Sequence, residues 1–147
     1  MEQGVEIFEV REALPEFVGP INGLLAQLSS SPRCFTLEML QEIAASGSSH
    51  LFLARIGEDV VAMLTLGEYL APTGRKIWIE DVVVDCSMRG RKLGRAMLEH
   101  AIGFARKCGG GSLMLTSRPS RVAANALYRS GGFLQKETNV YKMEIDE

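Results

Sequence analysis

Residues 79–98 read IEDVVVDCSMRGRKLGRAML, a stretch in which three local patterns follow one another without a gap. It begins with a run of β-branched residues, which is typical of a central strand. A short turn follows that holds two glycines and four cations, and apolar residues then recur at the spacing of a helix. The stretch therefore predicts a strand, a tight basic turn and a helix in direct succession.

The segments on either side extend this unit into a mixed α/β domain that takes in residues 1–147. A strand that follows such a helix lies parallel to the strand before it, because a strand–helix–strand unit crosses over in that way. The patterns predict strands at Val5–Glu12, Leu51–Ile56, Val60–Tyr69, Ile77–Val84, Ser112–Thr116, Phe133–Glu137 and Val140–Ile145, and helices at Leu14–Leu28, after an N-cap at Thr36, from Leu93 to about Phe104 and at Ser120–Ser130.

The composition is that of a globular protein, with 46% hydrophobic and 23% charged residues. No segment is apolar over the length needed to cross a bilayer. The first residues are acidic and lack the basic region of a signal peptide. The three cysteines are widely spaced, which is not the pattern of a disulfide framework. We therefore expect a cytoplasmic protein that does not associate with membranes.

The net charge of −2 conceals an asymmetry along the chain. Residues 1–74 carry three basic and ten acidic side chains, whereas residues 75–147 carry thirteen basic and eight acidic ones. The second half therefore offers a positive surface to an anion. A broad nucleic-acid footprint usually needs a basic domain, so we expect no nucleic-acid partner.

The turn between the strand and the helix has the chemistry of an anion site. A helix that begins there leaves backbone N–H groups unpaired and carries partial positive charge at that end. A phosphate or pyrophosphate fits such a site, and Gly90 and Gly94 would let the backbone approach it closely. A Walker loop would need a lysine where Arg95 stands, and a Rossmann fingerprint would need a glycine at Met97. On these residues alone, a solvated basic helix face remains the alternative.

The helix at Ser120–Ser130 carries a second polar pattern. Arg121, Asn125 and Tyr128 fall within one narrow arc, while the alanines and Leu127 would face the core. This arrangement predicts that Leu127 anchors the helix and that Tyr128 points away from the core. A merely solvated face and a functional one remain open.

Two adjacent carboxylates, Glu80 and Asp81, interrupt the otherwise apolar central strand and would point to opposite faces of the sheet. A carboxylate in such a strand is costly unless it is paired or lines a cavity. A salt bridge at the end of the sheet and a functional role both remain open for this pair.

Together these stretches resemble the GNAT superfamily of N-acetyltransferases. The diagnostic segment of that family is a strand of the type V-x-V-D, then R/Q-x-x-G-x-G/A at the start of a helix, and here it reads VVVDCSMRGRKLGRA. Arg89 and Gly94 match the motif, whereas Lys92 stands where the first glycine is usual. The segment AANALYRSGGF resembles the family's A-x-x-L-Y-x-x-x-G-F helix and turn. The element order also fits the family's fold, a mixed, mostly antiparallel sheet flanked by helices with a central parallel βαβ unit at the acetyl-CoA site.

The resemblance implies acetyl-CoA as co-substrate and no metal. The pyrophosphate would lie on the N–H groups of the turn, with the pantetheine arm alongside the strand. Many relatives contact the cofactor through an asparagine at the position of Arg121, and Asn125 would take over that contact. The implied cofactor-binding residues are Val82, Val83, Val84, Arg89, Gly90, Arg91, Lys92, Leu93, Gly94, Arg95 and Asn125.

The resemblance also implies acetyl transfer to a primary amine by direct attack in a ternary complex. Tyr128 matches the family's general acid, which protonates the departing thiolate. A backbone N–H within Val82–Val84 would stabilise the oxyanion. The candidates for the base are Glu80 first, then Asp81, then Glu68, and an ordered water remains an alternative.

Two other classes of function remain open, a non-catalytic module that binds or senses CoA and an anion- or RNA-binding domain. The acceptor amine, a small molecule or a peptide, is not readable from the sequence. It would be set by Leu14–Phe35, by Glu68–Lys76 and by the C-terminal strands. The oligomeric state also stays open, with a homodimer among the alternatives.

Overall fold

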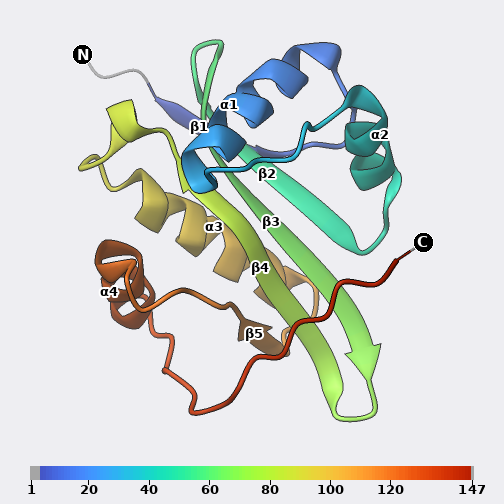
Figure 1. The fold of residues 1–147 in the computed structure, drawn as a ribbon, viewed down its shortest axis with the longest axis vertical. Helices are drawn as coiled ribbons and strands as arrows, with labels where there is room; N and C mark the ends of the chain where they lie inside the picture. Colours follow the sequence, from blue (N-terminus) through green and yellow to red (C-terminus); the bar gives the residue numbers. More distant parts are fainter. Residues whose placement is uncertain (1–3, 147) are drawn as a thin grey trace. The chain divides into compact units, whose positions relative to one another are not determined.

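The computed structural model describes residues 4–146 (Figure 1). The chain divides into two compact units, Met1–Thr116 and Ser117–Glu147. The first unit contains a five-stranded sheet with its helices, and the second contains one helix and a long segment without regular structure. The elements are β1 (Val5–Glu9), the 3-10 helix η1 (Pro15–Phe17), α1 (Val18–Leu28), α2 (Leu37–Ala45), β2 (Ser49–Ile56), β3 (Asp59–Ala71), β4 (Gly74–Val84), the 3-10 helix η2 (Cys86–Met88), α3 (Leu93–Lys107), β5 (Ser112–Met114) and α4 (Val122–Ser130).

The five strands lie side by side in the order β1-β2-β3-β4-β5. Neighbouring strands are antiparallel from β1 to β4, and β4 and β5 are parallel. The crossover between these two parallel strands contains α3, so the predicted βαβ unit is confirmed. The predicted fold class, an α/β fold with a mixed and mostly antiparallel sheet, is confirmed as well.

One face of the sheet is covered by α1 and α2, whose apolar stripes pack on β2, β3 and β4. The predicted N-cap is confirmed, since the Thr36 hydroxyl accepts the N–H of Met39 at 3.2 Å and so starts α2. The core on this face contains Ile21, Leu24, Leu40, Leu51, Leu53, Met63 and Val83.

The other face is covered by α3, which packs on β3 and β4. Its buried stripe consists of Leu93, Met97, Leu98, Ala101 and Ala105. The rings of His100 and Phe104 each lie 5.0 Å from the ring of Phe52 on β2. Burial, and then the charge of Lys107, lower the pKa of His100, so this histidine is a neutral packing residue at neutral pH.

The two strands predicted at Phe133–Glu137 and Val140–Ile145 are wrong. Residues 133–146 form neither helix nor strand, and their large apolar side chains are exposed, with Leu134 at 92% and Tyr141 at 87%. Alternation of apolar and polar residues gives a strand only where a neighbour supplies backbone hydrogen bonds. No described strand pairs with this segment.

Three expectations from composition can be set beside the structure. Within residues 4–146, every helix is too short or too polar to span a bilayer. Cys34, Cys86 and Cys108 carry free thiols. A single domain over residues 1–147 stays a prediction.

Candidate active site

Partway along its length, β4 loses its neighbour on one side (Figure 1). On that side β5 pairs only with Lys76–Trp78, whereas β3 pairs with β4 as far as Val84 on the other side. From Ile79 onward, this edge of β4 has no strand partner among the described residues. The predicted contact residues Val82 and Val83 lie on it, so an extended ligand could use the same backbone groups as a strand would.

A β-bulge interrupts β4 beside this unpaired edge. Thr65 of β3 pairs with Glu80 and Met63 pairs with Val83, so β4 holds one extra residue there. Asp81 lies in the bulge with φ at 51°, a left-handed conformation that aspartate tolerates better than most residues. The alternation therefore holds up to Glu80 and is broken at Asp81, and both side chains are exposed.

The turn after β4 presents unpaired backbone donors, as predicted. The N–H groups from Gly90 to Gly94 make no hydrogen bond to any residue that the structure describes. Lys92 is the N-cap of α3, with φ at 61° and no capping hydrogen bond from its side chain. A motif glycine would supply this left-handed conformation freely, whereas lysine pays roughly 1–2 kcal/mol for it. The departure from the motif thus makes the backbone of the turn less favourable at Lys92.

Four exposed cations surround these donors, Arg89, Arg91, Lys92 and Arg95. Arg95 also forms an ion pair with Glu99 one helical turn further on, with 3.2 Å between Nε and Oε1. Unpaired N–H groups at a helix start, together with concentrated positive charge, suit a pyrophosphate.

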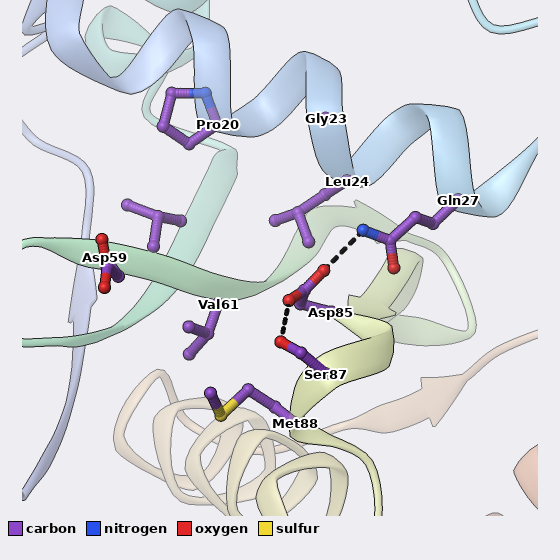
Figure 2. A pocket seen from close by; sticks show the side chains of 10 residues that line it. Pro20, Gly23, Leu24, Gln27, Asp59, Val61, Asp85, Ser87 and Met88 are labelled. Atoms are coloured by element: carbon purple, nitrogen blue, oxygen red, sulfur yellow. Dashed lines mark hydrogen bonds between the residues drawn. The ribbon is translucent and has the colours of Figure 1, made fainter.

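The start of the turn is fastened to α1 (Figure 2). The Gln27 side chain donates from Nε2 to Asp85 Oδ1 at 2.6 Å and accepts the N–H of Cys86 at Oε1 over 2.9 Å. The Ser87 hydroxyl donates to the other Asp85 oxygen. The hydrogen bonds from Ser87 and, second, from Gln27 lower the pKa of Asp85, which is therefore a carboxylate at neutral pH. A cavity of about 350 Å³ adjoins this cluster, between α1, the start of β3 and η2.

Glu80 belongs to a polar and aromatic surface on the sheet. Lys76, Trp78 and Glu80 alternate along β4 before the bulge and so share one face. On β3, Gly67 lies opposite Trp78 and Tyr69 lies opposite Lys76. The indole Nε1 of Trp78 lies 3.4 Å from the Tyr69 hydroxyl oxygen, and Tyr69 is 55% exposed. We call this set Tyr69, Lys76, Trp78 and Glu80 the β4 aromatic surface.

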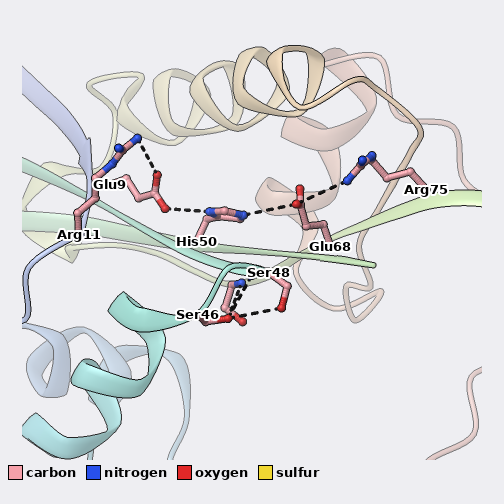
Figure 3. Close-up of polar contacts among 8 residues, drawn as sticks. Glu9, Arg11, Ser46, Ser48, His50, Glu68 and Arg75 are labelled. Atoms are coloured by element: carbon pink, nitrogen blue, oxygen red, sulfur yellow. Dashed lines mark hydrogen bonds and ion pairs between the residues drawn. The ribbon is translucent and has the colours of Figure 1, made fainter. Parts of the chain in front are cut away.

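A row of ion pairs crosses the opposite face of the sheet (Figure 3). The ring of His50 packs on α3, its Nδ1 lies 2.8 Å from a Glu9 oxygen, and its Nε2 lies 3.9 Å from a Glu68 oxygen. Arg75 lies 3.5 Å from the same Glu68 oxygen. Glu68, the third candidate for the base, is thus engaged in this row and separated by the sheet from Glu80. The row is a structural network that the sequence analysis missed.

In the second unit, α4 turns Tyr128 inward. Tyr128 is 7% exposed, whereas Leu127 is only half-buried and Ala123 is exposed. The prediction that Leu127 anchors this helix and that Tyr128 points away from the core is wrong. The aromatic ring has more apolar surface to bury and lies 6.2 Å from the ring of Phe133. Burial raises the pKa of the Tyr128 hydroxyl, and the charge of Arg121 opposes this shift.

Asn125 is engaged within the second unit. Its Nδ2 donates to the carbonyl oxygens of Arg118 and Arg121, each at 2.8 Å. The side-chain amide therefore fastens the start of α4. A contact between Asn125 and the cofactor would have to use the remaining side-chain oxygen.

The family follows from comparison with known proteins. Residues 22–133 match the Acetyltransferase (GNAT) family. This chain belongs to the GNAT family. It is 32% identical over 130 residues to glucosamine 6-phosphate N-acetyltransferase 1 of Oryza sativa subsp. japonica, a match that covers 80% of this chain and 75% of the rice protein. Among solved structures, a putative acetyltransferase from Agrobacterium tumefaciens str. C58 superposes with a TM-score of 0.83 at 25% identity, covering 95% and 99% of the two chains. Glucosamine-6-phosphate N-acetyltransferase from Arabidopsis thaliana superposes at 0.80 with 22% identity, covering 96% and 99%.

As a GNAT protein the chain is an acetyl-CoA-dependent N-acetyltransferase, and the family uses acetyl-CoA as its acetyl donor. The predicted family and reaction class are therefore confirmed, and the reading as an RNA-binding domain is set aside. Within residues 4–146, no group of three or more histidine, cysteine, aspartate or glutamate side chains is arranged to hold a metal ion.

The sequence analysis missed one contact of this candidate site, the link from Gln27 to Asp85 and Cys86. The residues joined are 58 and 59 positions apart, and an exposed glutamine near the end of an amphipathic helix carries no local signal. Asp85 alone was visible, as the last residue of the strand motif.

Proposed function

We propose that this GNAT protein transfers the acetyl group of acetyl-CoA to a primary amine by direct attack within a ternary complex, with residues 1–147 acting as one domain. The observation that carries the proposal is the unpaired edge of β4, which runs directly into a turn of unpaired N–H groups. In the reaction, the amine nitrogen bonds to the acetyl carbon and the carbon–sulfur bond breaks. The amine gives one proton to a base, and the thiolate takes one from an acid.

The turn supplies the site for the pyrophosphate in this proposal. The N–H groups from Gly90 to Gly94 point from a helix start that concentrates positive charge. Further binding comes from the exposed cations Arg89, Arg91, Lys92 and Arg95. Along the unpaired edge, Val82, Val83 and Val84 hold the pantetheine arm, and one of their N–H groups is aimed at the oxyanion.

Glu80 is the proposed base, ahead of Asp81. Partial burial of the Glu80 carboxyl and, second, the charge of Asp81 raise its pKa. A carboxylate whose pKa lies closer to neutral accepts a proton more readily than an ordinary one. Glu80 also lies on the β4 aromatic surface, which is an open face where an acceptor could bind.

Replacing Glu80 with glutamine should lower kcat by about 30-fold at pH 7 and by less at pH 9, because more of the amine then arrives deprotonated. The wild-type enzyme should lose activity as pH falls through the raised pKa of Glu80, which forms the acid limb of its pH profile. The variant should lack this acid limb. The check is a pH profile of kcat measured by thiol release. An equal loss at every pH would contradict the role of base.

Asp81→Asn is the matched control, because asparagine also tolerates a positive φ. Removing this negative charge should lower the pKa of Glu80 and move the acid limb of the profile to lower pH. If Asp81→Asn abolished the limb instead, Asp81 and not Glu80 would be the base.

For the acceptor, we propose the amine of an amino sugar phosphate, with glucosamine 6-phosphate tested first. Support comes from the similarity to the rice glucosamine 6-phosphate N-acetyltransferase 1 and from the β4 aromatic surface. Trp78 and Tyr69 offer flat apolar faces to a sugar ring, Lys76 offers a cation to a phosphate, and Glu80 lies on the same side.

The test is release of CoA thiol from acetyl-CoA by the purified chain with glucosamine 6-phosphate, with glucosamine and with a short peptide. We expect saturable turnover with the phosphorylated sugar and a much higher KM without its phosphate. Preference for the peptide would overturn the acceptor. CoA binding without turnover on any amine would instead favour a non-catalytic module.

A further inference from the structure

We infer that Gln27 is a positioning residue for the cofactor turn, acting through Asp85 and Cys86 without touching the cofactor itself. The inference rests on the proposed role of the turn as the pyrophosphate site. It adds a residue from α1, a helix that the loop motif does not include.

The link is a clamp made of two hydrogen bonds, and Figure 2 shows the one between Gln27 and Asp85. One amide group of Gln27 gives a hydrogen bond to a carboxylate and takes one from a backbone N–H, at 2.6 and 2.9 Å. Neither hydrogen bond can form unless the chain at Asp85 and Cys86 has one particular orientation. The backbone N–H of Asp85 is fixed as well, by the carbonyl of Val61 on β3 at 2.8 Å.

The clamp has a rigid base. Ile21 and Leu24 on α1 are 2% and 3% exposed and pack into the core of the sheet, so α1 cannot shift independently of β3 and β4. Gln27 lies one turn beyond Leu24, and its hydrogen bonds hold the chain segment after β4 against this fixed helix.

The turn needs such an anchor because little else holds it. Gly90 and Lys92 both have positive φ, and the conformation is unfavourable for lysine. The N–H groups between Gly90 and Gly94 have no described partner. A strained segment persists only where its surroundings determine it, and here the fixed points are the clamp upstream and the buried Leu93 at the start of α3.

Loss of the clamp should therefore weaken CoA binding and leave the chemistry intact. Without Gln27, the turn samples other orientations, and binding must restore the correct one. Gln27→Ala should raise the Kd of CoA about fivefold to tenfold, with kcat at saturation within about twofold of wild type. Because Gln27 is exposed, its hydrogen bonds add little to stability, and the thermal midpoint should fall by about 3 °C at most.

A swap of donor and acceptor tests whether Gln27 acts through Asp85. Gln27→Glu keeps an acceptor for Cys86 but sets two carboxylates against each other, so CoA binding should be weak at pH 8. Binding should improve toward pH 6, because one carboxyl of a close pair takes up a proton early and can then donate. In Gln27→Glu with Asp85→Asn, the asparagine amide donates to the glutamate, and CoA affinity should return to within about twofold of wild type.

The experiment is calorimetric titration of each purified variant with CoA at pH 6 and pH 8, with circular dichroism as the check of folding. Gln41→Ala is the matched control, because Gln41 is an exposed glutamine on α2 whose side chain makes no hydrogen bond to a described residue. Gly94→Val, which tests the turn directly, is measured beside them.

Weakened binding in Gln27→Ala, and recovery in the double variant, would support the inference. Unchanged affinity in both Gln27 variants, while Gly94→Val loses CoA, would overturn it and leave the turn as the cofactor site. A loss in Gln27→Glu that is equal at both pH values and unrelieved by Asp85→Asn would also overturn it. If Gly94→Val binds CoA normally, the proposed role of the turn fails, and the inference fails with it.

Discussion

Tyr128 is the residue predicted to protonate the departing thiolate. Replacing it with phenylalanine should therefore lower kcat by about 10²-fold or more, while the affinity for acetyl-CoA stays within a few-fold. The substitution keeps the ring of this buried residue and removes only the hydroxyl. Burial raises the pKa of this phenol above its usual value near 10, so the proton is retained throughout the neutral range. The Tyr128 hydroxyl makes no hydrogen bond to any described residue, so its proton is not committed elsewhere.

The competing interpretation is that Tyr128 only packs. Under that interpretation, Tyr128→Phe is as active as wild type and only Tyr128→Ala, which leaves a cavity, loses activity. Steady-state kinetics of both variants with one accepted amine separate the two. The sign of the pH dependence gives a second check: because the phenol pKa is raised, wild-type activity should not decline through loss of this proton until pH exceeds about 10. A fully active Tyr128→Phe enzyme would remove the assignment of Tyr128 as the acid.

Local patterns in the sequence were sufficient for most of the first unit. The apolar run before Asp85 gave β4, the spacing from Leu93 gave α3, and Thr36 gave the start of α2, because each signal lies within a few residues of the element that it determines. The unpaired N–H groups of the turn followed from the same local reasoning, since a helix start always leaves such donors.

Features that depend on residues far apart in the sequence could not be predicted from local patterns. The bulge at Asp81 exists only in the register of β4 against β3, and it moves Asp81 out of the expected alternation. The clamp from Gln27 joins residues that no local pattern connects. The segment after Phe133 alternates like a strand. Alternation, however, indicates only that one face would be apolar, and it does not supply a neighbouring strand to hydrogen-bond with. In α4, the pattern predicted that Tyr128 points away from the core, although Tyr128 is the buried residue of this helix.

Gly94 offers the sharpest test of the turn, because the backbone does not require a glycine there. Seven described glycines have positive φ, among them Gly90, but Gly94 is not one of them. It lies in the first turn of α3, where glycine costs about 1 kcal/mol relative to alanine. A glycine that the fold neither needs nor favours is explained if a ligand approaches the backbone at that point.

Gly94→Val should therefore raise the Kd of CoA by about 10²-fold, because the branched side chain occupies the space of the pyrophosphate and covers the N–H groups that would bind it. Folding should be unaffected, since valine has a higher helix propensity than glycine. The matched control is Gly103→Val on the same helix, where a Cβ would meet no atom outside the helix within 4 Å and no ligand is proposed. Calorimetry with CoA and circular dichroism of both variants give the comparison. If the two variants bind CoA equally well, the pyrophosphate does not lie on this turn, and the basic residues around it are only a solvated helix face.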